Sequence, residues 1–330
     1  MVFFLAATVL WHLWMAAKGY ANYRDQHLGT ALEFAAGRID LFHPIIVGFN
    51  ANDAPTALEL PVWQAVAALL FKAFGAWPGW ANVASLLFLV AGLWPLFQIA
   101  RTYLGSRGAW WALICFSAQP NIVFLGGRGG TDGSCLTLTL WFVYFAERLL
   151  REGKWRWFIP AAGFGALSAV SKAPFFFSAG LACATMLLAR RERGLRYWLM
   201  LIGVGAVAIG AFALWSRHTH QLAERAEFPL VDLRLSGETE GTSTAWWYFG
   251  DWKYRLDPRN WIKGGWRFVN LELGGAALVG LLGAGFLVLR GGLAVHWFAA
   301  GVATVLVFTH LVLQHGNYYL MFSPAVALLF

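Results

Sequence analysis

The residues best suited to chemistry are acids and cations at the ends of long apolar runs. Asp25 directly follows the first of these runs, in the segment 23–27 (YRDQH), two residues before His27. A carboxylate in that position can act at a membrane surface. The alternatives are a solvated loop charge or one half of an ion pair with Arg24, which contributes little to stability.

Two further acids follow along the same polar segment. Asp53 lies in the turn-forming stretch 50–55 (NANDAP), and Glu59 comes two residues before Pro61. Stretches rich in Asn, Asp and Pro favour turns. Both acids can also serve as caps for the helix that Pro61 begins. They are candidate contacts for a ligand or a cation, with helix capping as the alternative.

A glycine-rich turn at 126–133 (GGRGGTDG) carries one basic and one acidic residue between two apolar runs. It lacks the preceding strand and the glycine register of nucleotide-binding loops. Its glycines let the backbone approach a ligand closely, and Arg128 is suited to binding an oxyanion. Asp132 is either part of this candidate site or the cap of the next helix.

Two later motifs combine polar groups with aromatic residues. Lys172 lies in 171–177 (SKAPFFF), where Pro174 interrupts an apolar run. Its ammonium either extends to the membrane surface or holds an anionic lipid headgroup. The stretch 314–319 (QHGNYY) contains His315, Tyr318 and Tyr319, which form either an aromatic belt or part of a site.

The composition identifies the elements that must position these groups. The chain has 330 residues, of which 59% are hydrophobic, 17% aromatic and only 13% charged. This balance predicts an all-α integral membrane protein and excludes intrinsic disorder. The apolar runs are continuous, so an outer-membrane β-barrel is excluded too. The net charge of +8 reflects the basic loops that orient a membrane protein and does not indicate binding to nucleic acid. The three Cys lie in apolar runs and favour neither a disulfide framework nor a zinc cluster.

About ten crossings are predicted from apolar runs of roughly 20 residues each. A further stretch, 61–74, is either a short span or a helix in the interface. We expect one membrane domain over 1–330, whose last run ends at Phe330 without a polar flank, as in a truncated form of a longer protein. The first run lacks the basic start of a signal peptide. The ten runs lie near 1–17, 82–100, 108–125, 134–150, 157–172, 174–189, 197–215, 271–289, 294–312 and 318–330.

The distribution of charge orients these spans. With 61–74 taken as not crossing, the short loops on one side carry eleven Lys or Arg, against Arg128 and Lys172 opposite. The positive-inside rule therefore places the segments 18–60 and 216–270 outside. The first holds Asp25, and the second is expected to form a lid. All four polar motifs then lie on the outer face.

The order of these motifs resembles the C-type membrane glycosyltransferases, in the branch that contains protein O-mannosyltransferases and the lipid A aminoarabinose transferase. The resemblance covers residue 1 to about 193, and the remainder only through hydropathy and the last motif. Gln26 stands where O-mannosyltransferases typically have a second acid, which makes a protein acceptor less supported. The large soluble C-terminal portion of some relatives is missing. The matching features are Asp25, the PVW start at 61–63, the Arg and Asp of 127–132, the LSAVSK stretch at 167–172, and Tyr318 and Tyr319 with Pro324.

The resemblance implies transfer of a sugar from a polyprenyl-phosphate donor to a hydroxyl of a lipid, glycan or protein, with inversion. It implies a bacterial inner membrane and a site facing the periplasm or exterior. Arg128 and Lys172 would hold the donor phosphate. Asp25 would act as general base, with Asp132 as the alternative base or an orienting residue.

No cofactor is required by this scheme, and the metal dependence stays open. A divalent cation could bind if Asp25, Asp53, Glu59 and His27 fold together. The acids Asp53 and Glu59, with His27, are also candidate acceptor contacts, as are the later residues His315, Tyr318 and Tyr319.

The competing functions are a transporter or flippase of a lipid-linked substrate, and a scaffold of an envelope assembly. A transporter should place ionisable groups near the middle of the membrane and often shows repeated halves. The predicted spans are almost free of charge and unrepeated. The sequence therefore favours the glycosyltransferase.

Overall fold

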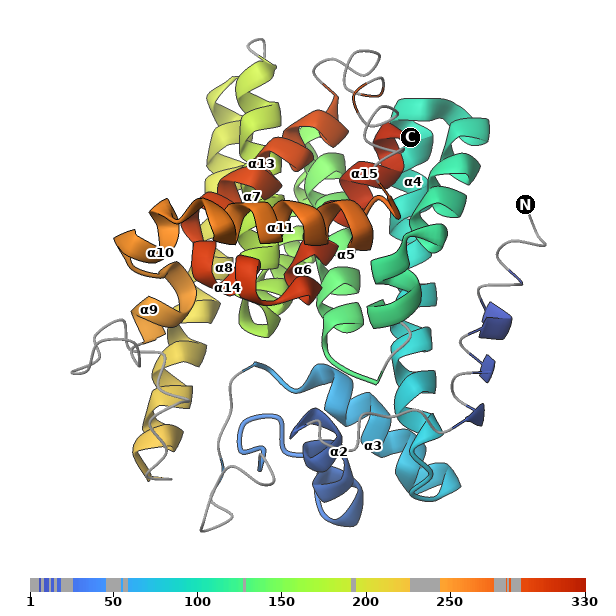
Figure 1. The fold of residues 1–330 in the computed structure, drawn as a ribbon. Helices are drawn as coiled ribbons and strands as arrows, with labels where there is room; N and C mark the ends of the chain where they lie inside the picture. The colour runs from blue at the N-terminus through green and yellow to red at the C-terminus, as the bar shows by residue number, and fades with distance from the viewer. Residues whose placement is uncertain are drawn as a thin grey trace.

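The computed structural model describes residues 6, 9–11, 13, 14, 17, 18, 26–45, 55, 59–126, 129–190, 194–225, 244–275, 283, 285 and 292–330. Within these residues all regular structure is helical, which confirms the predicted all-α class (Figure 1). Two of the described helices, Gly79–Ala118 and Leu195–Arg225, are long and apolar enough to cross a membrane. The predicted spans 1–17 and 271–289 fall mostly outside the described residues.

The helix α4 (Gly79–Ala118) contains the predicted span 82–100 and the first part of the span 108–125. Gly105 breaks it with a φ of 70°, in the left-handed region that favours glycine. Beyond the helix, a π-helical turn η1 (Ile122–Gly126) leads into the glycine-rich turn. The second predicted span is therefore two elements rather than one continuous helix.

Four helices beyond the glycine-rich turn form the centre of the bundle. The first three agree with the predicted spans within two residues, whereas α8 continues to Arg225 instead of ending at residue 215. Its extension looks polar in sequence, yet Trp215, Thr219 and Leu222 recur at helical spacing and are buried. The four helices are α5 (Asp132–Glu152), α6 (Phe158–Ser171), α7 (Ala173–Ala189) and α8 (Leu195–Arg225).

The last two predicted spans are divided into shorter helices. The span 294–312 ends early, because α13 (Leu293–Val307) stops before Phe308 and α14 (Thr309–Gln314) follows it. The span 318–330 begins as a 3-10 helix, η5 (Gly316–Phe322), before α15 (Ser323–Leu329). A polar turn thus enters the bundle where continuous apolar helices were expected.

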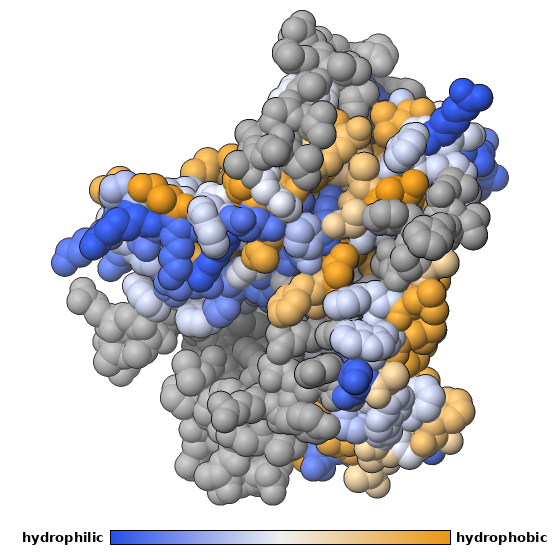
Figure 2. All heavy atoms as spheres, turned by 45° about the vertical axis from the view of Figure 1, so that its right-hand side comes forward, coloured by the Kyte–Doolittle hydropathy of each residue, from blue (hydrophilic) through white to orange (hydrophobic). Residues whose placement is uncertain are grey.

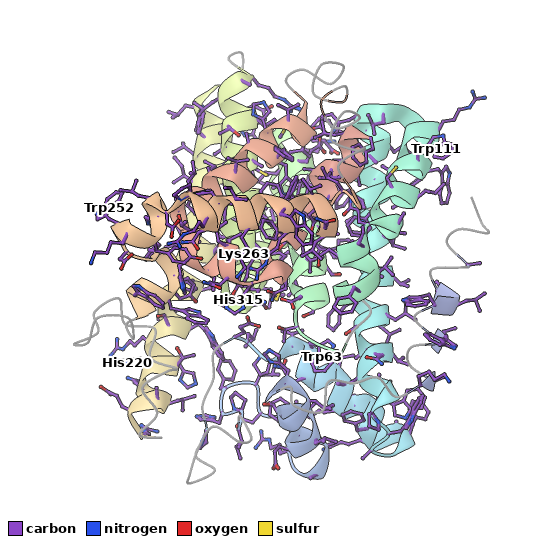
Figure 3. All side chains as sticks on the ribbon, viewed as in Figure 1. Trp63, Trp111, His220, Trp252, Lys263 and His315 are labelled. Atoms are coloured by element: carbon purple, nitrogen blue, oxygen red, sulfur yellow. The ribbon has the colours of Figure 1, made fainter. Side chains whose placement is uncertain are left out.

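The segment predicted as a lid is helical where the structure describes it. It contains α9 (Thr244–Phe249), α10 (Trp252–Leu256) and α11 (Pro258–Leu271). In Figure 1, α11 lies across the bundle helices rather than along them. At one end of the bundle, α2 (Gln26–Ala36) packs beside α3 (Val62–Phe74). Trp63, labelled in Figure 3, ties α3 to α4 by donating from Nε1 to Ser85 Oγ over 2.9 Å.

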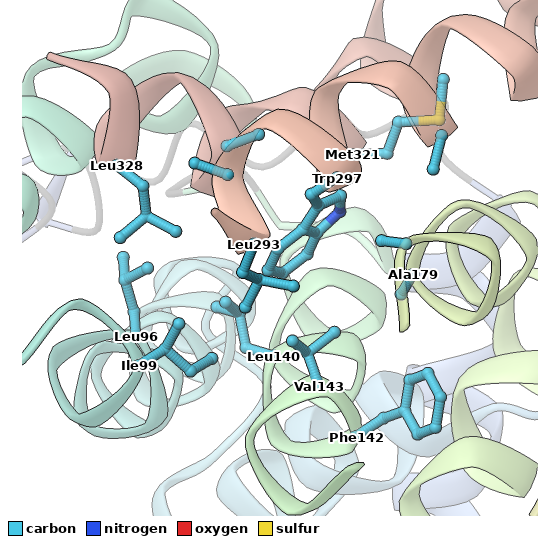
Figure 4. Close-up of a cluster of buried hydrophobic side chains, with 14 of the residues drawn as sticks. Leu96, Ile99, Leu140, Phe142, Val143, Ala179, Leu293, Trp297, Met321 and Leu328 are labelled. Carbon is cyan, nitrogen blue, oxygen red and sulfur yellow. The ribbon is translucent and has the colours of Figure 1, made fainter. Parts of the chain in front are cut away.

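The bundle is apolar both inside and outside. Its core contains large side chains such as Leu96, Leu140 and Trp297, which Figure 4 shows packed together. Large apolar side chains are also exposed on the outer surface, among them Trp111 of α4 and Ile209 of α8. Figure 2 shows apolar side chains in orange on one face of the molecule. This combination is the expected one for helices surrounded by lipid.

Candidate functional site

Lys172 occupies the break between α6 and α7, where the backbone becomes extended with a φ of −159°. Its amide N–H donates to the Ser168 carbonyl at 2.8 Å, and its own carbonyl accepts from Phe175 N at 3.0 Å. Pro174 then starts α7. Because both helices hold the backbone, the side chain has a fixed position, and it is only 7% exposed.

The Lys172 ammonium contacts two carboxylates and one aromatic ring. It forms a short ion pair with Asp132 Oδ1 and lies 3.5 Å from Glu59 Oε1. It also lies 4.8 Å from the ring centroid of Tyr318. The alternative in which Lys172 extends to the membrane surface is therefore wrong. A buried cation surrounded in this way is typical of a functional site in a membrane protein.

Asp132 is the first residue of α5, but it does not cap that helix. The N-cap is Thr131, whose side chain makes no capping hydrogen bond. Asp132 Oδ1 instead accepts from Asn317 Nδ2 at 2.9 Å, in addition to pairing with Lys172. The capping interpretation of Asp132 is wrong, and the structure joins it to a residue far away in the sequence.

The glycine-rich turn is attached to α4 where the structure describes it. Gly129 N donates to Asn82 Oδ1 at 2.8 Å, and Gly130 N donates to Ser85 Oγ at 3.4 Å. A Cβ at Gly129 would lie 3.0 Å from the Ala81 side chain, so a larger residue there would crowd α4. These contacts fix the start of α5 and hence Asp132. Arg128 itself lies outside the described residues.

Glu59 belongs to the same cluster and is not a helix cap. The N-cap of α3 is Pro61, with no side-chain capping bond. Leu60 N donates to the Val170 carbonyl at 3.1 Å, which holds this stretch against the end of α6. Glu59 thereby reaches Lys172. Its second oxygen, Oε2, is buried without a hydrogen-bond partner among the described residues.

Of the remaining candidates in the first segment, the structure describes His27. His27 on α2 has its Nδ1 3.0 Å from Gln64 Nε2 of α3. Asp25 and Asp53 lie outside the described residues. No group of three or more His, Cys, Asp or Glu within the described part of the chain is arranged to hold a metal ion. The proposed cation contacts thus stay a prediction.

The two tyrosines of the late motif have different surroundings. Tyr318 lies under the Lys172 ammonium, whereas Tyr319 is 3% exposed and packs against Phe268 and Phe322. The predicted placement of Tyr319 beside the site is not observed. His315, labelled in Figure 3, lies between Trp247, at 5.1 Å, and Tyr318, at 6.3 Å between ring centroids.

Burial lowers the pKa of His315, and the nearby positive charge of Lys172 lowers it further. The imidazole is therefore neutral at pH 7, since the ordinary pKa of histidine is about 6.5. A neutral ring can donate from one nitrogen and accept at the other. It adds hydrogen-bonding capacity near the cluster without adding charge.

An apolar groove runs along α7, the helix that follows Lys172. Its volume is about 300 Å³, and it lies between α5, α7 and α8. Phe176 and Phe177, which follow Lys172 by one turn of helix, line one part of it, with Gly180, Leu181, Val204 and Gly205 further along. The groove is therefore suited to a hydrocarbon chain.

The sequence did not single out Asn317 as a site residue. It stands between two candidates in the motif 314–319, and its amide is the second partner of Asp132. An asparagine in a polar turn carries no distinctive pattern, because turns favour this residue for their own reasons. Its proximity to two aromatic candidates was the available signal.

Residues 53–217 match the family model of the dolichyl-phosphate-mannose-protein mannosyltransferases. Two solved structures of ArnT from Cupriavidus metallidurans are similar in fold. The undecaprenyl phosphate complex has a TM-score of 0.69 and the apo state 0.65, each at 16% identity. Both alignments cover 99% of this chain and 58% of the ArnT chain, so the chain spans less than two thirds of those structures. The comparison with curated proteins gives no match.

The family match covers half of the chain, including α3 to α7 and most of α8. It therefore covers Glu59, Asp132 and Lys172, three acidic or basic residues of the cluster. It also confirms the resemblance to C-type membrane glycosyltransferases. The chain belongs to the dolichyl-phosphate-mannose-protein mannosyltransferase family.

Proposed function

We propose that the chain is a membrane glycosyltransferase that moves a sugar from a polyprenyl-phosphate donor to an acceptor hydroxyl at the outer face of the membrane. The observation that carries this proposal is the buried Lys172 ammonium between Asp132, Glu59 and the Tyr318 ring. The apolar groove along α7 supports a long lipid substrate. Family membership supports the transfer of a lipid-linked sugar.

Lys172 retains the capacity to bind a phosphate. A lysine ammonium has three N–H donors, and two of them suffice for Asp132 and Glu59. The third is free for a phosphate oxygen. Arg128, on the neighbouring glycine-rich turn, would supply a second cation. When the sugar leaves, the polyprenyl phosphate departs as an anion and needs positive charge rather than a proton.

The acceptor hydroxyl must lose a proton as the new bond forms, and we assign this task to Asp25. Asp132 is the alternative base. Its Oδ1 already accepts from Lys172 and Asn317, which supports a role in orienting the cation. A single displacement at the anomeric carbon inverts its configuration. In this scheme Tyr318 and His315 lie where they can contact the bound substrates.

The partners follow from this scheme. The donor is a polyprenyl-phosphate sugar, and the ArnT structure bound to undecaprenyl phosphate is the precedent for the lipid carrier. The acceptor is a lipid, glycan or protein hydroxyl. The chain would be in the bacterial inner membrane, with the segments 18–60 and 216–270 facing the periplasm or exterior. A divalent cation is compatible with the first segment and is not required.

Release of undecaprenyl phosphate tests the proposal directly. Purified protein in nanodiscs is offered undecaprenyl-phosphate-linked hexoses, pentoses and aminopentoses, with envelope extract as the source of acceptors. Mass spectrometry should detect undecaprenyl phosphate and a sugar-modified acceptor for at least one donor. If no donor is cleaved, and the protein in sealed proteoliposomes instead moves the donors across the bilayer intact, the chain is a flippase.

The proposed orientation is tested separately. Cysteines introduced at Asn52 and Ser243 should react with an impermeant maleimide in intact cells, whereas one at Gly194 should not. Labelling at Gly194 alone would place the polar cluster on the cytoplasmic side.

A further inference from the structure

Glu272 is a buried acid outside the cluster described above. It is the first residue after α11 and is 0% exposed. Its Oε1 accepts a short hydrogen bond from Asn121 Nδ2, and its Oε2 accepts from Ser323 Oγ at 2.6 Å. Within the described residues no Lys, Arg or His forms an ion pair with it. Burial of a carboxyl of this kind costs desolvation free energy, which an apolar side chain of similar size would avoid.

The partners of Glu272 lie on separate segments that surround η5. Asn121 precedes η1, and its Nδ2 also lies 3.4 Å from the carbonyl oxygen of Gly316, the first residue of η5. Ser323 immediately follows η5, and its carbonyl accepts from Gln119 Nε2 at 2.9 Å. Glu272 thus connects the end of α11 with both ends of η5.

The packing of α11 restricts the same segment. A Cβ at Gly316 would lie 2.8 Å from Leu271, so the last turn of α11 rests directly on the start of η5. Arg267 donates to the carbonyl of Leu313 and, at 2.8 Å, to that of Gln314. The hydrogen bonds of Glu272 therefore complete a fixed junction between α11 and η5.

The junction is relevant because η5 carries two residues of the cluster. Asn317 donates to Asp132, and Tyr318 lies under Lys172. We propose that Glu272 is a positioning residue for the transfer reaction, which holds η5 so that Asn317 and Tyr318 remain in contact with Asp132 and Lys172. The role in turnover rests on the proposed function, whereas the role in holding η5 does not.

The chemistry distinguishes the variants. Glutamine at position 272 can still accept from Asn121 through its oxygen and donate to Ser323 Oγ through its nitrogen. Leucine fills a similar volume but removes the acceptor that Asn121 and Ser323 share. Glu272→Gln should therefore preserve the junction and Glu272→Leu should open it. Glu147 provides a matched control. It is also a buried acid, 2% exposed, but it lies near the end of α5 that is opposite to Asp132.

Hydrogen exchange measures the position of η5 without any substrate. In Glu272→Leu, peptides covering 316–322 should exchange about tenfold faster, the equivalent of one lost hydrogen bond. Asn121→Ala should accelerate the same peptides, whereas Glu272→Gln and Glu147→Leu should not. Unchanged exchange in Glu272→Leu, or faster exchange spread evenly over the whole protein, would overturn the proposal.

A double-mutant cycle tests the link to turnover, with release of undecaprenyl phosphate from the best donor of the panel as the readout. Glu272→Leu should lower kcat about tenfold in the parent and by a smaller factor in Asn317→Ala, because the contact of Asn317 with Asp132 is already absent there. Glu147→Leu should have equal effects in both backgrounds. Equal effects of Glu272→Leu in both backgrounds would contradict the positioning role. If no donor is cleaved, the proposed function fails, and the exchange result still decides the role of Glu272.

Discussion

The charged clusters at the two ends of α5 differ in how far apart their members lie in the sequence and in how exposed they are. At its first residue, Asp132 is joined to Lys172 and Asn317, which are 40 and 185 residues away in the sequence. At its last residue, Glu152 pairs with Arg148, Arg156 and Lys154, all within four residues. Lys172 is 7% exposed, whereas the side chain of Arg156 is 63% exposed.

The range and burial of these ion pairs distinguish the Asp132 end of α5, a candidate site, from the Glu152 end, which is typical of a membrane boundary. The pairs around Glu152 are local, and each exposed pair of that kind contributes about 0.3–0.5 kcal/mol. They agree with the positive-inside rule and need no further role. The pair between Lys172 and Asp132 requires burial of a charge and the meeting of distant segments. Such an arrangement is weak support for stability and is better explained by function.

The largest expected effect concerns stability. Lys172→Met leaves Asp132 and Glu59 facing each other without their cation, which should cost roughly 3 kcal/mol of unfolding free energy. Arg148→Met, at the other end of α5, should cost less than about 1 kcal/mol. Denaturant unfolding in detergent micelles measures both. Equal losses would remove the distinction between the two ends.

The next effect is on turnover. Asp25→Asn keeps the size of the side chain but removes its basicity, so transfer should fall on the order of 100-fold while undecaprenyl phosphate still binds. Glu147→Gln, an acid near the other end, should leave transfer close to the parent value. The assay of undecaprenyl phosphate release measures both variants. Asp132→Asn is the control: if it abolishes transfer while Asp25→Asn does not, the base is Asp132.

A smaller effect is expected for Asn317→Ala. Loss of one hydrogen bond to the Asp132 carboxylate should lower kcat about tenfold. The same release assay, run at saturating donor, gives this value. An unchanged kcat would mean that Asn317 only supports the turn that contains it.

The smallest effect concerns acid stability. The folded protein lowers the pKa of His315, so between the folded and the unfolded pKa the unfolded chain binds more protons. Its contribution to stability is complete above about pH 6.5 and is lost as the pH falls below that value. His315→Gln should therefore show a smaller drop in Tm between pH 7.5 and pH 5.5 than the parent. An identical drop in both proteins would show that His315 does not contribute.

Features with a local pattern were predictable from the sequence. Lys172 was recognisable because Pro174 interrupts an apolar run beside it, and Asp132 because it ends a glycine-rich turn. Most helices were predictable too, because a continuous apolar run marks each of them in the sequence. The extension of α8 to Arg225 was missed, because its buried positions are separated by polar residues.

Contacts that depend on the fold were not predictable in detail. Glu59 was identified as a possible ligand contact, but its position beside Lys172 depends on the packing of Leu60 against the end of α6. Tyr318 and Tyr319 are adjacent and chemically identical, and only the 3-10 turn of η5 directs one to the site and the other to the core. Glu272 has no sequence signal, since its two partners, Asn121 and Ser323, belong to two segments far from it in the sequence.

Binding of undecaprenyl phosphate to variants near the two ends of α5 tests whether the Lys172 cluster holds the donor phosphate. In nanodiscs, Lys172→Ala and Arg128→Ala should each weaken binding by about 1.5–3 kcal/mol, which is roughly 10- to 150-fold in Kd. Arg128→Lys should restore part of the loss, because lysine lacks the bidentate geometry. Arg148→Ala should bind like the parent. Equal affinity of all four variants and the parent would contradict the assignment of the Lys172 cluster as the donor phosphate site.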